Sequence, residues 1–213
     1  MAVSNKFFDK DKDSLILAVL EHAPFDGWSD DTLVTAANQI GFGVNTARRI
    51  FNKSGPSMIE YYSSWADRRM IESVKAHSIN ELGVRRRVGH IVRTRFEQNE
   101  RYREAIRRAL ACLALPQNAI LSMKCLYRTV DSIWFLVGDK STDYNFYTKR
   151  TLLAGVYGAT LLYWLDDMSE EYQETWEFLD RRLDGIIRVG RFQKVIRGIF
   201  PDHNIALRAL RRY

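Results

Sequence analysis

Four side chains in the second half of the chain have the types and spacing of a protein-binding surface. Asp143, Phe146, Tyr147 and Arg150 stand at positions i, i+3, i+4 and i+7. In a helix this spacing places a carboxylate, two aromatic rings and a guanidinium on one face. Because aromatic and arginine side chains dominate binding energy at interfaces, we expect this face to bind a partner. The spacing also fits a capped first helical turn with an internal ion pair, and it does not separate the two.

Small side chains follow on the same predicted helix, in a run from Thr151 to Leu165 that carries no charge. Gly155 and Gly158 lie in this run, next to Ala154 and Ala159. Each glycine costs about 1 kcal/mol relative to alanine inside a helix, so a close helix contact or a cavity is expected here. The central helix of an α-helical core is the other interpretation. The run is too short to span a bilayer, which takes about 20 apolar residues.

The sequence lacks the motifs of the common catalytic and metal sites. No histidine forms a Glu-x-x-His or His-Glu-x-x-His motif, and there is no Walker loop, Gly-x-Ser-x-Gly elbow or dinucleotide fingerprint. Cys112 and Cys125 lie in apolar surroundings without CxxC spacing, which is typical of core residues in a reducing compartment. We therefore expect a binding protein with no catalytic residues, metal or enzymatic cofactor.

Basic residues are concentrated in two segments of this 213-residue chain, whose net charge is +6. Arg85–Arg108 contains nine Arg against three Glu, and Arg191–Tyr213 contains six Lys or Arg against one Asp. Such segments suggest contact with an anionic surface. The first twelve residues show neither a signal peptide nor a transit peptide pattern, so we expect a soluble or peripheral protein.

The pattern of apolar residues predicts an all-α protein, with only four prolines to interrupt it. Residues 1–12 are expected to form a polar, mobile leader, and residues 13–60 a helix-turn-helix-like head. In this head, Ser29 has the position of an N-cap before DDTLVTAANQI, and a glycine turn precedes a short helix over Asn45–Phe51. The order of these helices, with the long helix after them, is similar to that of TetR-type regulators.

Binding of DNA by this head is the alternative that its charge does not favour. Asn45, Arg48 and Arg49 could reach bases and phosphates from the short helix. The segment Trp28–Glu60, however, has no net charge, since three basic residues balance three acidic ones. We therefore expect a retained structural unit here.

Residues 61–190 are predicted to form a helical ligand-binding domain, and residues 191–213 a basic amphipathic segment. The apolar stripe of this last segment alternates with basic residues on its other side. Such a helix can lie in a membrane interface, with its cations on lipid phosphates. Docking of the same helix on the protein's own core is the alternative. The predicted membrane-binding residues are Arg191, Phe192, Lys194, Val195, Ile196, Arg197, Ile199 and Phe200.

Several stretches resemble one known family. LEHAPFDGWSDDTL, GDKSTDYNFYTKRTLLAGVY, LYWLDD and TWEFLDRRLDG are similar to the lipid-binding accessory proteins of ubiquinone biosynthesis, the ninth Coq protein family. The resemblance covers about residues 13–190. It implies a homodimeric, all-α, TetR-like fold that binds lipid in place of DNA, and a C-terminal amphipathic helix that acts at the membrane.

The resemblance also implies two sites. One is a lipid site between the helices predicted near 117–137, 142–166 and 169–188. Its residues are Leu126, Val130, Leu153, Gly155, Val156, Gly158, Ala159, Leu162, Trp176, Leu179 and Leu183. The other is a docking patch for the di-iron demethoxyubiquinone hydroxylase. Its residues are Ile133, Trp134, Asp143, Phe146, Tyr147 and Arg150.

These observations lead to one functional prediction. The protein binds an isoprenoid or ubiquinone-precursor lipid, with a phospholipid as another candidate for the bound molecule, and presents the precursor to the hydroxylase or another enzyme of the ubiquinone pathway. It is expected to be a homodimer without enzymatic activity, peripheral on a bacterial inner membrane from the cytoplasm, or on the matrix face if mitochondrial. The alternative is a TetR-type ligand-responsive transcription regulator.

Overall fold

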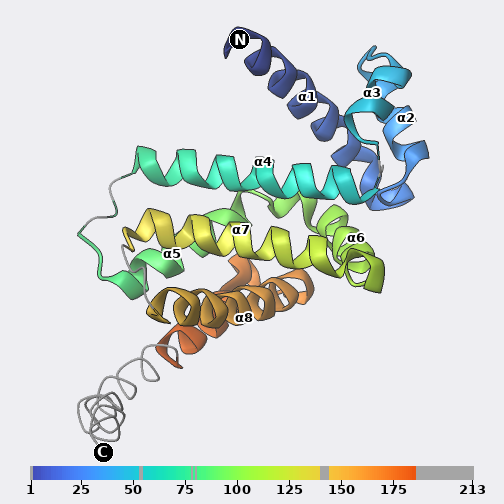
Figure 1. Cartoon of the computed structure of the whole chain (residues 1–213). Coiled ribbons are helices and arrows are strands. Elements are labelled where there is room, and N and C mark those ends of the chain that lie inside the picture. Colours follow the sequence, from blue (N-terminus) through green and yellow to red (C-terminus); the bar gives the residue numbers. More distant parts are fainter. Residues whose placement is uncertain (1, 53–54, 78, 80, 140–143, 186–213) are drawn as a thin grey trace, which may run out of the picture.

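The structure is a computed structural model that describes residues 2–52, 55–77, 79, 81–139 and 144–185. These residues form helices joined by turns, and they contain no strand (Figure 1). Asp143 and the basic amphipathic segment predicted over 191–213 lie outside the described residues. The α-helices are α1 Ala2–Asp26, α2 Asp30–Gln39, α3 Val44–Ile50, α4 Gly55–Ala76, α5 Val84–Glu97, α6 Arg103–Leu113, α7 Ala119–Val137 and α8 Tyr144–Asp166. A further helix occupies 173–185, and short 3-10 helices lie at Glu100–Tyr102, Pro116–Asn118 and Glu170–Tyr172.

The head consists of α1, α2 and α3, as the sequence predicts. Ser29 caps α2 with its side-chain oxygen, which accepts a hydrogen bond from the Thr32 amide at 3.1 Å. One detail differs from the prediction. The segment 1–12 was expected to be a leader, but α1 begins at Ala2 and not near Asp13, so this segment is helical from Ala2 onward.

The long helix α4 connects the head to the body, and its first residue must be glycine. A Cβ on Gly55 would lie 2.3 Å from the backbone oxygen of Trp28, too close for any side chain. The indole of Trp28 in turn donates a hydrogen bond to the Ala105 oxygen of α6 at 2.8 Å. Head, α4 and α6 are thereby joined at one point.

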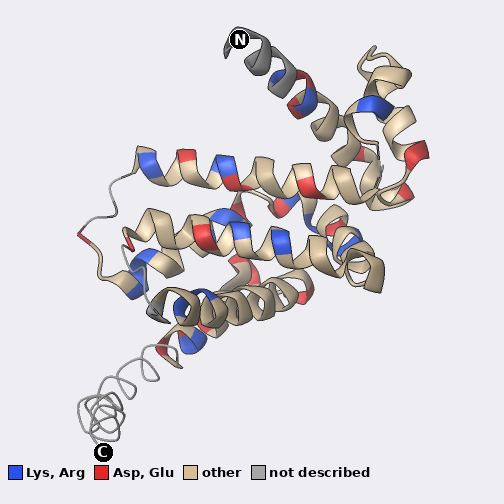
Figure 2. Ribbon diagram, viewed as in Figure 1, with Lys and Arg blue, Asp and Glu red and all other residues tan. Residues whose placement is uncertain are grey.

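In the body, α7 and α8 pack side by side beneath α4 (Figure 1). Gly138 ends α7 with φ +82°, a left-handed conformation that glycine adopts without strain. Figure 2 shows that charged residues are absent along most of α8. At the C-terminal end of α8, the backbone oxygens of Trp164 and Leu165 have no partner within the helix. The Arg103 guanidinium donates hydrogen bonds to them at 2.7 Å and 3.0 Å.

Candidate functional site

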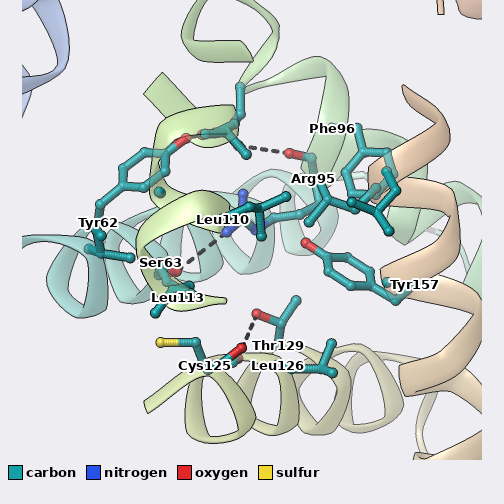
Figure 3. Close-up of a pocket in the computed structure, with 18 of the residues that line it drawn as sticks. Tyr62, Ser63, Arg95, Phe96, Leu110, Leu113, Cys125, Leu126, Thr129 and Tyr157 are labelled. Atoms are coloured by element: carbon teal, nitrogen blue, oxygen red, sulfur yellow. Dashed lines mark hydrogen bonds between the residues drawn. The ribbon is translucent and has the colours of Figure 1, made fainter. Parts of the chain in front are cut away.

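An apolar cavity of about 280 Å³ lies inside the body, between α4, α5, α6, α7 and α8 (Figure 3). This volume is close to the lower end of the range for small-molecule sites. Leu162 of α8 lines the cavity although 62% of its surface is exposed, so the cavity opens to solvent beside it. The aliphatic lining includes Ile59, Ile106, Leu110, Leu113, Leu126 and Leu161.

Arg95 in the cavity lining belongs to a buried ionic network. Arg95 of α5 donates from Nε to Asp67 Oδ1 on α4 at 3.1 Å, and these side chains are only 7% and 4% exposed. Asp67 also accepts hydrogen bonds from Arg128 Nε at 3.2 Å and from the Thr129 hydroxyl at 2.9 Å, both on α7. Two guanidinium groups therefore share one carboxylate. Burial opposes the charge of Arg95, but the negative charge of Asp67 and its hydrogen bond favour that charge, and the pKa of the guanidinium is raised.

Two aromatic side chains of α8 add hydrogen-bond donors to the cavity. Tyr157 is buried against Phe96 at 5.3 Å between ring centroids, and its hydroxyl points into the space between α5 and α7 (Figure 3). Burial raises the pKa of this phenol, which keeps it protonated at neutral pH. Trp164 stacks on the same phenylalanine at 5.2 Å, and its buried Nε1–H has no hydrogen-bond partner among the described residues.

Only part of the predicted lipid-binding set lines this cavity. Leu126, Gly158 and Leu162 do. Gly155 and Ala159 were also expected to line it and do not, because the rotation of α8 places them on its exposed face. The other predicted residues pack in the core of the body around the cavity or at its edge without lining it. They are Val130, Leu153, Val156, Trp176, Leu179 and Leu183.

The predicted docking patch is also divided by the structure. Tyr147 is 66% exposed and Phe146 is half-buried, so both can meet a partner. Ile133, Trp134 and Arg150 are buried, which corrects the prediction that they form part of a surface.

Arg150 is buried because it joins α8 to α7. Its Nε donates to Asp131 at 2.7 Å, and its guanidinium lies over the Phe146 ring at 3.4 Å from the ring centroid. This ion pair between helices differs from the one that the spacing suggested within the segment, which would involve Asp143, a residue outside the described part of the chain. A partner approaching Tyr147 would meet an aromatic pair held in place by this arginine.

An exposed apolar stripe on α7 was not predicted. Ile120, Met123 and Tyr127 follow one another at i, i+3 and i+7, and all three are exposed. Ile120 is the most exposed of the three, at 86%. The stripe gives the body an apolar surface in addition to that around Tyr147.

Known proteins of one family are similar to this chain over most of its length. The COQ9 family model matches residues 119–190. The protein "Ubiquinone biosynthesis protein COQ9, mitochondrial" of Rattus norvegicus is 31% identical over 190 residues, which are 86% of this chain and 61% of that protein. The chain belongs to the COQ9 family. The Homo sapiens protein of the same name is 30% identical over 190 residues, which are 86% of this chain and 59% of that protein. The chain thus spans about three fifths of these COQ9 relatives.

The fold of this COQ9-family chain is that of TetR regulators, as predicted. The crystal structure of the TetR transcriptional regulator from Nitrosomonas europaea ATCC 19718 matches it with a TM-score of 0.68, over 84% of this chain and 98% of that one. The two sequences are 18% identical, so the likeness concerns the fold alone. In this COQ9-family chain, Arg48 of α3 forms an ion pair with Asp30 at 2.6 Å. This ion pair engages one of the two arginines of α3 that could contact DNA.

The segment that matches the COQ9 model contains α7, α8 and the helix over 173–185. It therefore supplies Tyr147, Tyr157 and Trp164, whereas Arg95 and Asp67 come from helices before it. The described residues contain no group of three or more His, Cys, Asp or Glu that could hold a metal. Among them no single helix meets the length and hydropathy of a membrane span, although one pair bent at residues 113–116 does so by length and composition.

Sequence reasoning missed the polar side chains of the cavity. For Arg95 a signal was available, because it falls on the apolar stripe of α5 together with Val88, Ile91 and Val92. An arginine on a buried helix face needs a partner and so indicates an internal polar site. No comparable signal marks Tyr157, since an aromatic residue in an apolar helix is usually a core residue.

Proposed function

We propose that this COQ9-family protein acts in ubiquinone biosynthesis by binding an isoprenoid or ubiquinone-precursor lipid and presenting it to the demethoxyubiquinone hydroxylase. The names of its relatives support the pathway. The observation that carries the proposal for lipid is the apolar cavity that opens beside Leu162. Moving a polyisoprenoid through water costs about 0.8 kcal/mol per exposed CH₂, and an apolar cavity lowers that cost.

In this proposal, the protein works as a homodimer at a membrane surface, and the enzyme performs the chemistry. Tyr147 and Phe146 would contact the enzyme, since exposed aromatic side chains are common anchors of interfaces. The basic segment Arg191–Tyr213 would bind anionic lipid headgroups. The membrane would be the mitochondrial inner membrane, as the names of the relatives favour, or a bacterial inner membrane.

The test measures the lipid bound to the purified protein and asks whether the amount depends on Gly158. Gly158 lines the cavity, and a Cβ built on it meets no atom within 4 Å, so Gly158→Leu places a side chain in the cavity without a clash at the backbone. Gly155→Leu is the matched control, because Gly155 also has open space around it but lies on the exposed face of the same helix.

Organic extraction and mass spectrometry should find isoprenoid or acyl lipid in the wild-type protein and in Gly155→Leu, and much less in Gly158→Leu. Circular dichroism confirms that both variants fold. Absence of lipid from the wild-type protein, or equal lipid in both variants, would contradict the proposed use of this cavity.

The charges of the head do not favour the alternative function, a transcription regulator that binds DNA. The segment Trp28–Glu60 has no net charge, and Arg48 of the candidate recognition helix is paired with Asp30. A protein that neutralises phosphates needs free basic side chains on one face.

A further inference from the structure

Several polar groups at the cavity already have partners within the protein. Asp67 is the one carboxylate of the network described above, and it already accepts bonds from Arg95, Arg128 and Thr129. The side-chain oxygen of Asn99 is also occupied, since it accepts a bond from the Tyr62 hydroxyl at 2.8 Å. These two side-chain acceptors are therefore in use.

Three donors on the same side remain available. The Trp164 indole N–H is buried and has no hydrogen-bond partner within the described part of the chain. The Tyr157 hydroxyl lies in the cavity lining and makes no hydrogen bond to a described residue. Arg95 uses Nε for Asp67, and Nη2 reaches the Ser63 oxygen at 3.5 Å, while Nη1 makes no hydrogen bond to any described residue. Unpaired donors inside a protein cost free energy, so they favour a ligand atom that can accept their bonds.

The distribution of these groups also gives the cavity a direction. Tyr62 and Arg95 lie on α4 and α5 and Asn99 directly follows α5, whereas the exposed lining residue, Leu162, lies on α8. A polar end of a ligand would find partners at the inner wall, and an apolar chain would leave through the opening. Because the volume is small, the cavity would hold the head and the beginning of a chain rather than a whole polyprenyl tail.

We infer that the cavity binds its lipid head-first, and that it selects a head with a hydrogen-bond-accepting oxygen through the Tyr157 hydroxyl, the Trp164 indole and Arg95. A quinone carbonyl and a carboxylate share this chemistry. The inference rests on the proposed lipid-binding function and adds the class of head and its orientation. It also assigns Tyr157 a role in specificity.

The test compares three probes on the delipidated full-length chain by isothermal titration calorimetry. Ubiquinone-1 offers quinone carbonyls, decanoate offers a carboxylate, and decane has no acceptor. Tyr157→Phe removes one hydroxyl and keeps the ring that packs on Phe96. Tyr163→Phe is the matched control, because its hydroxyl bonds Glu174 at 3.0 Å, away from the cavity lining.

At least one oxygen-headed probe should bind more tightly than decane. Tyr157→Phe should weaken that probe by about two- to tenfold and leave decane unchanged, as expected for the loss of one hydrogen bond. Which probe binds distinguishes a neutral quinone from an anionic carboxylate. Equal affinity for all three probes, or an equal loss in Tyr157→Phe and Tyr163→Phe, would overturn the selection of the head and leave lipid binding intact. If none of the probes binds, lipid binding at this cavity fails as well.

Discussion

The buried carboxylate of Asp67 should contribute strongly to stability, and Asp67→Asn tests this. The substitution preserves size and one acceptor but removes the negative charge that Arg95 and Arg128 share. Arg128 is 29% exposed at its side chain and can turn to water, whereas Arg95, at 7%, cannot. The main cost is therefore one uncompensated buried guanidinium.

Loss of one partner of a buried ion pair costs about 3–5 kcal/mol. In a protein of this size each kcal/mol lowers Tm by about 2–4 °C, so a decrease of about 6–20 °C is expected. Urea unfolding followed by circular dichroism measures the free energy of unfolding directly. The position of the network in the cavity wall also predicts weaker retention of lipid by this variant.

The matched control is Asp13→Asn. Asp13 accepts hydrogen bonds from Tyr61 at 2.7 Å and Arg68 at 2.6 Å, but the Asp13 and Arg68 side chains are 34% and 42% exposed. Ion pairs exposed to water contribute about 1 kcal/mol or less. If Asp67→Asn loses no more stability than Asp13→Asn, burial of the network is not what makes it important.

Three further predictions concern other parts of the molecule. Asp167 accepts four hydrogen bonds at the start of the last described helix, and although burial opposes its charge, these bonds lower the pKa of the carboxyl to about 2. The stability that this carboxylate supplies is present above its unfolded pKa of about 4 and is lost as the pH falls toward 2. Between these pH values, the free energy of unfolding measured in urea should decrease by about 1–2 kcal/mol more for the wild-type protein than for Asp167→Asn. Tyr147→Ala should weaken binding of the hydroxylase at least tenfold in a pull-down titration with little effect on Tm, whereas Phe25→Ala, an exposed aromatic of the head, should leave binding unchanged. Arg191→Glu combined with Arg197→Glu should reduce flotation with anionic liposomes, most at low salt, and flotation equal to that of the wild-type protein would remove the basic segment from the proposed mechanism.

Local signals in the sequence were sufficient for most of the helices and for the family. Ser29 and Gly138 mark a helix start and a helix end, and both act as the caps that their residue types predict. The order of the helices predicted a TetR-like fold, which the comparison with a TetR regulator confirms. These features depend on a few neighbouring residues, so they can be read without knowledge of the tertiary structure.

The assignment of residues to the cavity was less successful, and α8 explains why. A helix face can be identified from sequence when polar residues mark the side that faces solvent. Between Thr151 and Leu165 there is no charged residue, so the sequence contains no such mark. Gly155 and Ala159 are exposed while Tyr157 and Trp164 face the interior, and the alternative orientation would fit the sequence equally well.

Sequence alone thus determined the helices, the TetR-like order and the membership of the COQ9 family, because caps, turns and characteristic stretches are local. The rotation of α8, the burial of Arg150 and the meeting of Arg95 with Asp67 and Tyr157 were decided by packing between helices that are distant in the chain. Those contacts depend on which helix faces pack together. In the uncharged part of α8, no polar residue in the sequence indicates which face that is.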